Sequence, residues 1–257
     1  MARIDTEGFA RFEAFIAGTG GTYVFDGDSA VRGIGTLLDV VRDMGLDPMK
    51  TADLKEGLFF LFNIETVHMP DLQGGRTILA PNHVSDLDAP ILGLLHPRIH
   101  IVSKNDWTNN QELRRFLDIH YDLYGFDRAS IQSLRALIVD AARYFNDSDE
   151  NRHYLVFSQG TISDINCNSP ARVSPIAQKI ALRTGVPIIP MFIEQPSIDH
   201  PTRIVFDGPM NPTRGEDFGA LWLERLKALQ DGLDPPARRP VLTHRHAHNN
   251  KPGDPFF

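Results

Sequence analysis

A histidine and an aspartate lie five positions apart in the segment Leu79-Ala80-Pro81-Asn82-His83-Val84-Ser85-Asp86-Leu87-Asp88, where an apolar run gives way to polar residues. A tight turn would bring the Asp88 carboxylate back to the His83 imidazole. A carboxylate bonded to one ring nitrogen fixes the imidazole tautomer and stabilises the imidazolium that forms when the other nitrogen takes a proton. The spacing therefore predicts a general base, which typically raises a reaction rate by roughly 10²- to 10⁴-fold.

The same residues also fit a purely structural interpretation. Ser85 and Asp88 match a capping box at the start of a helix, which would leave His83 as a polar turn residue. Capping accounts for Ser85 and Asp88 but gives no reason for the pair Asn82-His83. We therefore expect His83 and Asp88 to be the catalytic residues.

The elements around this segment predict an α/β fold. From Arg76 onward, short β-type runs alternate with helical ones, which is typical of a sheet with crossover helices. The predicted strands are 77–80, 99–103, 154–157, 187–193 and 203–206. The predicted helices are 88–95, 111–119, 130–145, 174–184 and 217–230. Since several strands are apolar on both faces, we expect a mostly parallel central sheet flanked by helices, with His83 following the carboxyl end of a strand.

Two further segments flank this α/β domain, which we expect over residues 76–232. Helical periodicity predicts an N-terminal helical segment, residues 1–75, packed on the main domain. Residues 233–257 are rich in proline and polar residues, which predicts a loosely ordered tail. Its histidines at 244, 246 and 248 lack neighbouring cysteines or carboxylates to complete a tetrahedral site, so we expect no bound metal.

The composition limits the function classes. The chain has 26 Lys and Arg against 33 Asp and Glu, and its formal net charge of -7 argues against a nucleic-acid binder. The single cysteine, Cys167, cannot form an intrachain disulfide, which favours a reducing compartment. The start of the chain does not resemble a signal peptide, and the longest apolar run, Leu58 to Phe62, is too short to cross a bilayer. We expect a cytoplasmic protein without a transmembrane segment, and peripheral membrane contact stays open.

Asn82, His83 and Asp88 resemble the Asn-His-x4-Asp signature of the glycerolipid acyltransferases, the family that includes lysophosphatidic acid and glycerol-3-phosphate acyltransferases. Ser85 and Leu87 also match residues common inside that motif. Further blocks follow in the family's order as far as about Asp207. The resemblance implies an acyltransferase in which His83 is the base and Asn82 belongs to the substrate site.

Two of the further blocks would supply cations. Ile101-Val102-Ser103-Lys104 resembles the strand end where the family has a lysine that helps to hold the acceptor's phosphate. Gly125-Phe126-Asp127-Arg128 resembles the family's glycine and arginine block, with Arg128 at the matching arginine. A lysine is a point charge, whereas an arginine can bind an anion through two parallel hydrogen bonds. Lys104 and Arg128 are therefore substrate-binding candidates, and surface solvation or ion pairing is the alternative.

Another block departs from the family. Phe157-Ser158-Gln159-Gly160-Thr161-Ile162-Ser163 corresponds to Phe-Pro-Glu-Gly-Thr-Arg-Ser, and the match makes Ser158, Gln159, Gly160 and Thr161 substrate-binding candidates. Isoleucine in place of arginine makes no charge-assisted hydrogen bond, so a weaker phosphate site follows. Three explanations compete: an acceptor without a phosphate monoester, a phosphate held by Lys104, Arg128 and Arg172, or a degenerate site. The intact Asn82-His83-Asp88 set argues against degeneration.

These features predict transfer of a fatty acyl group from a thioester, acyl-CoA or acyl carrier protein, to a hydroxyl or amine of a small molecule or lysolipid. No cofactor beyond the acyl donor is expected. Arg114 and Arg115 are candidate contacts for an acyl carrier protein, which is acidic. The alternatives are an acyl-thioester hydrolase, in which His83 activates water, and a non-catalytic module that binds acyl thioesters or carrier proteins.

Overall fold

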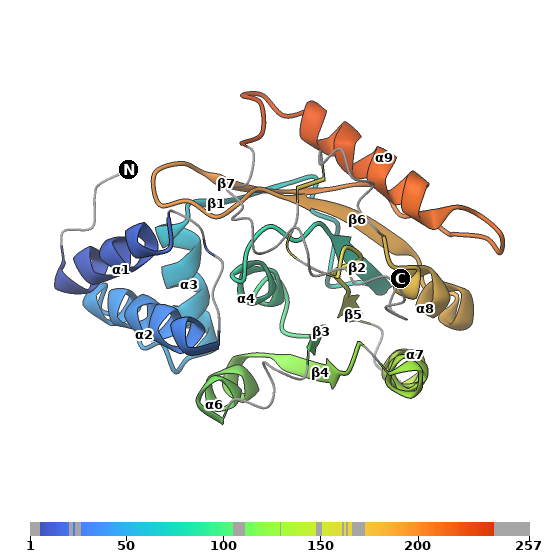
Figure 1. Ribbon diagram of the computed structural model, residues 1–257. Helices are drawn as coiled ribbons and strands as arrows, with labels where there is room; N and C mark the ends of the chain where they lie inside the picture. The colour runs from blue at the N-terminus through green and yellow to red at the C-terminus, as the bar shows by residue number, and fades with distance from the viewer. Residues whose placement is uncertain are drawn as a thin grey trace.

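The computed structural model contains a mostly parallel central β-sheet with helices on both faces (Figure 1). The structure describes residues 6–20, 23, 27–104, 111–128, 130–147, 151–160, 162, 164–165 and 173–238. Within these ranges the sheet has seven strands in the order β1-β7-β6-β2-β5-β3-β4. Their bounds are β1 (Ile64–Val67), β2 (Arg76–Pro81), β3 (Ile99–Lys104), β4 (Asp122–Phe126), β5 (Arg152–Leu155), β6 (Ile188–Ile193) and β7 (Thr202–Phe206). The predicted α/β class is confirmed.

Strand β2 lies in the middle of the sheet. It is parallel to both neighbours, with Leu79 opposite Ile189 of β6 and Leu155 of β5. The other pairs are also parallel, except that β6 and β7 are antiparallel. Because β2, β5 and β6 run in the same direction, their carboxyl ends meet at one edge of the sheet, where ligands bind in such folds. The turn that contains His83 follows β2 at this edge.

Helices form a layer on each face of the sheet. Their bounds are α1 (Glu7–Gly18), α2 (Gly27–Asp43), α3 (Thr51–Leu61), α4 (Asp88–Gly93), α6 (Gln111–His120), α7 (Ile131–Asn146), α8 (Ile176–Thr184) and α9 (Phe218–Asp231). Successive residues of a strand point to opposite faces. Accordingly Leu79 packs in the core shared with α1 to α4 and α6, whereas Ile78 and Ala80 pack in the core shared with α7, α8 and α9.

The two outermost strands, β1 and β4, are missing from the elements predicted from the sequence. Strand β1 falls within the segment expected to be helical, which therefore contributes a strand beside β7 as well as the helices α1 to α3. Figure 1 shows these three helices grouped together at one side of the molecule. Both strands lie at edges of the sheet, and their residues are mostly half-buried or exposed.

The C-terminal part of the described chain packs back on the sheet. Trp222 of α9 is buried, and its indole N–H donates to the carbonyl oxygen of Ala80 at 2.9 Å, three residues before His83. Of the predicted tail, residues 233–238 are described, and the histidines at 244, 246 and 248 lie outside the described residues, as does Cys167. In the part of the chain that the structure describes, no helix has both the length and the apolar character to cross a membrane.

Candidate active site

The turn between β2 and α4 is folded around the carboxylate of Asp88, the first residue of α4. This side chain is fully buried. Its Oδ2 accepts from the backbone N–H groups of Val84 at 2.6 Å and Ser85 at 2.9 Å, and its Oδ1 accepts from the Ser85 hydroxyl at 2.5 Å. The Ser85 hydroxyl oxygen in turn accepts from the Leu87 N–H at 3.2 Å. Both hydrogen bonds between these two residues are donated by Ser85, and α4 begins directly after Leu87, so Ser85 and Asp88 do not form the reciprocal capping box that the structural interpretation predicts.

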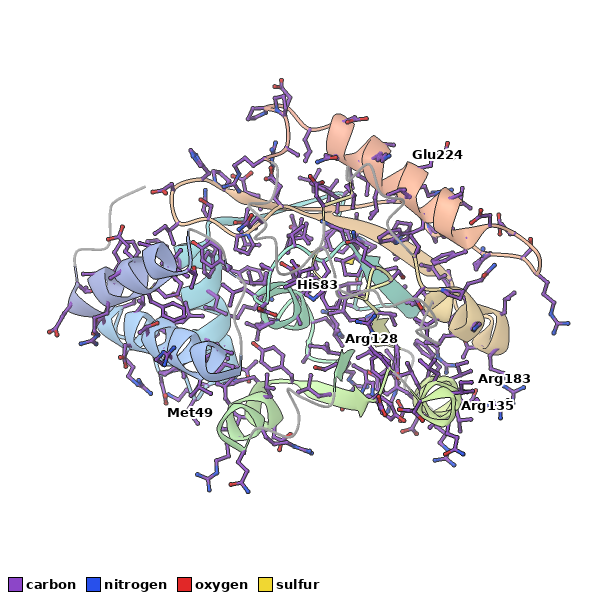
Figure 2. All side chains as sticks on the ribbon, in the orientation of Figure 1. Met49, His83, Arg128, Arg135, Arg183 and Glu224 are labelled. Atoms are coloured by element: carbon purple, nitrogen blue, oxygen red, sulfur yellow. The ribbon has the colours of Figure 1, made fainter. Side chains whose placement is uncertain are left out.

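The same carboxylate also bonds His83. The His83 Nδ1 lies 3.0 Å from the Asp88 Oδ2. Because a carboxylate accepts, this contact favours the tautomer with the proton on Nδ1, and Nε2 keeps its lone pair. The imidazole packs on the ring of Phe157, with the centroids 4.3 Å apart, and its side chain is 18% exposed. Figure 2 shows His83 near the centre of the molecule.

Gln159 holds the backbone of the same histidine. Its Oε1 accepts from the His83 N–H at 2.7 Å, and the side chain is buried. Gln159 follows β5, so this hydrogen bond joins the turns at the ends of two adjacent strands. An amide provides the acceptor without placing a negative charge beside the histidine.

Arg128 and Gly160 meet at the neighbouring turn. The Gly160 N–H donates to the Phe157 carbonyl at 2.9 Å, and the φ angle of +64° at Gly160 is one that glycine adopts without strain. The Arg128 guanidinium, from the loop between β4 and α7, donates through Nη1 to the carbonyl oxygen of Gly160. Arg128 therefore braces the turn that carries Gln159.

Asn82 continues the pairing of β2 with β6. Its Nδ2 donates to the carbonyl of Ile193 at 2.9 Å, and its Oδ1 accepts from the N–H of Ile193 at 2.7 Å. Its own N–H donates to the carbonyl of Met191 at 3.2 Å. The side chain is buried, and it fixes the residue before His83 against the end of β6.

A buried ion pair anchors that end of β6. Glu194, next to Ile193, accepts from the Arg203 Nε and Nη2 at 2.8 Å each and from the Arg238 N–H at 2.9 Å. Burial alone would raise the pKa of Glu194, but the hydrogen bonds from Arg203 and Arg238 hold that pKa below its ordinary value. The C-terminal segment is thereby tied to the strand that holds Asn82.

Ser158 and Ile162 are both buried. The Ser158 carbonyl accepts from the Ser174 N–H at 2.7 Å, which joins the β5 turn to the start of α8. Ile162, at the position of the family's arginine, contributes an apolar side chain that is only 6% exposed.

The remaining predicted residues are only partly described. Lys104 is the last residue of β3, and only its backbone is described. Thr161 and Arg172 lie outside the described residues. Among the residues that are described, no three His, Cys, Asp or Glu side chains cluster as a metal site would require.

Five predicted residues are joined by hydrogen bonds or by adjacency in the chain: His83, Asp88, Gln159, Gly160 and Arg128. Asn82 and Ser158 are buried beside them. Sequence reasoning assigned no role to the Phe157 ring or to the backbone of Ile193. An aromatic residue two positions before Gln159 was the available signal for Phe157, whereas a backbone partner leaves no signal in residue type.

The fold and the turn together define an α/β protein of the acyltransferase class. The sequence matches the model of the family described as Acyltransferase over residues 63–194, a little over half of the chain. The protein belongs to this family, and the resemblance drawn from the Asn82-His83-Asp88 motif is confirmed. The matched range runs from β1 to the end of β6 and contains every predicted site residue.

A solved structure is also similar to this chain. It is the crystal structure of the 1-acyl-sn-glycerophosphate (LPA) acyltransferase, PlsC, from Thermotoga maritima, with 16% sequence identity and a TM-score of 0.48. The match covers 89% of this chain and 96% of that one. A likeness of this degree says nothing about substrates.

Proposed function

We propose that this protein transfers a fatty acyl group from a thioester, acyl-CoA or acyl carrier protein, to a hydroxyl or amine acceptor, with His83 as the general base. The observation that supports this most directly is the 3.0 Å contact between the His83 Nδ1 and the buried Asp88 Oδ2. That contact leaves Nε2, on a partly exposed ring, to take a proton.

The proposed reaction proceeds without an acyl-enzyme. The His83 Nε2 takes the proton of the acceptor's O–H or N–H while the acceptor atom attacks the thioester carbonyl carbon. The tetrahedral intermediate then collapses, the C–S bond breaks, and the imidazolium returns its proton to the leaving thiolate. Neither serine of the site is a suitable nucleophile, because the Ser85 hydroxyl donates to Asp88 and Ser158 is fully buried.

Asp88 acts by orientation and charge. Three hydrogen bonds from Val84 and Ser85 hold its carboxylate in place, in addition to the contact with His83. A carboxylate fixed in this way keeps the imidazole in one orientation and stabilises the imidazolium without a change of position during the reaction. The reaction as proposed needs no cofactor besides the acyl donor.

We further infer an acceptor that lacks a phosphate monoester, either a small molecule or a lysolipid. Ile162 is apolar and buried where the family has an arginine, and one N–H of Arg128 is committed to the Gly160 carbonyl. Both features weaken the attraction for a phosphate relative to a site with two arginines available.

The test is incubation with labelled palmitoyl-CoA and with palmitoyl-loaded acyl carrier protein, against a panel of phosphorylated and unphosphorylated acceptors. We expect an acylated product only when an acceptor is present, with unphosphorylated acceptors preferred. His83→Ala should lower turnover at least about a hundredfold while the circular dichroism spectrum stays unchanged.

Other outcomes would contradict the proposal. Release of free fatty acid at the same rate with and without acceptor identifies a hydrolase. Binding of the acyl thioester without consumption, with the same affinity in His83→Ala, identifies a non-catalytic binding module. Undiminished transfer by a folded His83→Ala variant removes His83 from the mechanism.

A further inference from the structure

The outer sides of α7 and α8 combine positive charge with exposed apolar side chains. The cations are Arg135 and Arg143 on α7 and Lys179 and Arg183 on α8, all exposed. The exposed large apolar residues are Ile131 (59%), Val139 (49%) and Leu182 (42%). We call these seven residues the basic face. Figure 2 shows Arg135 and Arg183 at the same end of the molecule, where the two helices lie side by side.

No acidic side chain offsets this charge from within the two helices. Their only acidic residue is Asp140, which is directed toward the sheet. Its Oδ2 lies 3.2 Å from the His100 Nε2 and accepts from the Tyr154 hydroxyl at 2.9 Å. Burial alone would raise the pKa of Asp140, but the neighbouring His100, the hydrogen bond from the Tyr154 hydroxyl and the Arg143 charge together hold that pKa below its ordinary value. Asp140 is therefore engaged away from the basic face.

Several arginines on other helices are already paired. Arg11, Arg42 and Arg114 each form an ion pair on the surface, with Glu7, Asp39 and Asp118 among their partners. By contrast, Arg135, Lys179 and Arg183 form no ion pair with any of the residues that the structure describes. Unpaired cations clustered on a chain with a net charge of -7 suit an acidic partner.

The order of residues along α7 favours a protein over a lipid surface. Ile131, Arg135, Val139 and Arg143 follow one another at intervals of four, so each lies beside the one before it on a ridge that turns gradually around the helix. A helix that lies in a membrane interface has its cations on one face and its apolar residues on the opposite face. Arginine and apolar side chains mixed on a single face are typical of protein interfaces. A symmetric contact with a second copy would instead set these cations against each other.

The basic face begins beside the candidate active site. Helix α7 starts three residues after Arg128, which bonds the Gly160 carbonyl, and α8 starts two residues after Ser174, which bonds the Ser158 carbonyl. With 16 residues at about 1.5 Å each, α7 extends roughly 24 Å from that edge of the sheet. A partner docked on this face would lie next to the turns that hold His83.

We propose that the basic face is the docking surface for an acidic acyl carrier protein, which presents its acyl thioester to His83. This inference rests on the proposed acyl transfer and adds the surface that recognises the donor. Helix α6, whose Arg114 and Arg115 are the contacts expected from the sequence, is less suited because Arg114 already pairs with Asp118 at 3.1 Å.

The test compares two charge reversals of equal size. One variant combines Arg135→Glu with Arg183→Glu, and the matched control combines Arg114→Glu with Arg115→Glu. We expect the first variant to lower kcat/KM for palmitoyl-loaded acyl carrier protein at least about tenfold and to leave kcat/KM for palmitoyl-CoA within about twofold. The control should change neither value by more than about threefold. Binding of the carrier protein to the His83→Ala enzyme should weaken by the same factor in the first variant and weaken further with added salt.

The binding measurement separates failure of this inference from failure of the proposed function. If the unmodified enzyme consumes neither donor, the proposed acyl transfer fails, while carrier-protein binding still reports on the basic face. Equal losses in the two variants, or equal losses with the two donors, overturn the inference. The same holds if the Arg135 and Arg183 variant loses binding to phosphatidylglycerol vesicles but not to the carrier protein, since that result identifies a membrane-binding face. Should the charge reversals impair folding, Arg135→Ala with Arg183→Ala provides the same comparison.

Discussion

The Oε1 of Gln159 accepts the backbone N–H of His83 at 2.7 Å, although the two residues are 76 positions apart in the chain. The residue that departs from the family's glutamate is therefore in direct contact with the proposed base. The amide preserves a hydrogen bond that a carboxylate would also make, and it does so without a charge beside the pair of His83 and Asp88.

Replacing Gln159 by leucine should weaken the enzyme through the position of His83. The variant leaves a His83 N–H without its acceptor, which costs about 1 to 3 kcal/mol for a buried group. We expect kcat to fall about tenfold or more with little change in KM for the acyl donor. Gln159→Glu is the matched control, because it keeps the acceptor, and its kcat at neutral pH should stay well above that of Gln159→Leu. Equal kcat values for the unmodified enzyme and Gln159→Leu would show that this hydrogen bond does not position the base.

Asp88→Asn should lower the reaction rate more strongly than the removal of the Ser85 hydroxyl, which also bonds the Asp88 carboxylate. Asparagine keeps the size of the side chain but loses the charge that stabilises the imidazolium, so kcat should fall by roughly 10²- to 10⁴-fold. Ser85→Ala is the comparison, since it removes one hydrogen bond to Asp88 and leaves the contact with His83. We expect a loss of about tenfold or less for Ser85→Ala. Similar losses in both variants would mean that Asp88 acts by holding the turn rather than by its charge.

The sequence predicts the central elements of the fold better than the edges, for a physical reason. Strands β2 and β6 are covered on both faces, and they therefore appear as apolar runs with almost every residue buried. Strand β1, Ile64–Val67, has two exposed residues among its four, and β4 includes the exposed Asp122 and the glycine at 125. Half-exposed strands with polar residues and glycine have no distinct pattern of their own.

The contacts of the candidate site also differ in how far the sequence predicts them. The contact between His83 and Asp88 is local, so the spacing of five residues is sufficient to predict it. The contacts of Gln159 with His83 and of Asn82 with Ile193 join segments 76 and 111 positions apart. Such contacts depend on which strands are neighbours in the sheet, and a single sequence does not specify that order.

A third prediction concerns the opposite edge of the sheet and the dependence of stability on pH. The His100 Nδ1 lies 2.7 Å from the Asp122 Oδ2, and its Nε2 lies 3.2 Å from the Asp140 Oδ2. Burial would lower the pKa of His100, but the two carboxylates outweigh it and raise the pKa from 6.5 to about 9. The ring N–H groups are not well aimed at these oxygens, so we attribute the shift mainly to charge attraction.

Because the pKa of His100 is higher in the folded protein, the stabilisation is fully present below about pH 6.5 and is lost as the pH rises through about 9. We expect the free energy of unfolding to fall by roughly 1 to 3 kcal/mol between pH 6.5 and 9.5, with the lower end favoured because Asp122 is half exposed and solvent screens its charge. Urea unfolding at both pH values measures this. In His100→Gln this decrease in the free energy of unfolding between the two pH values should be absent. An unchanged decrease would show that other titrating groups cause it.

Asn82→Ala distinguishes two roles for a residue that the family resemblance assigns to the substrate site. The nitrogen and the oxygen of the Asn82 side chain each form a hydrogen bond with the backbone of Ile193. Alanine would therefore leave the buried N–H and the buried carbonyl of Ile193 without partners, which lowers the free energy of unfolding by about 1 to 3 kcal/mol for each group. We expect a lower urea midpoint together with a lower kcat, because the turn that holds His83 loses its attachment to β6. Saturating amounts of acceptor should not restore the rate. A variant with unchanged stability and a raised KM for the acceptor would instead mean that Asn82 contacts the substrate, and the hydrogen bonds to Ile193 would then be secondary to that contact.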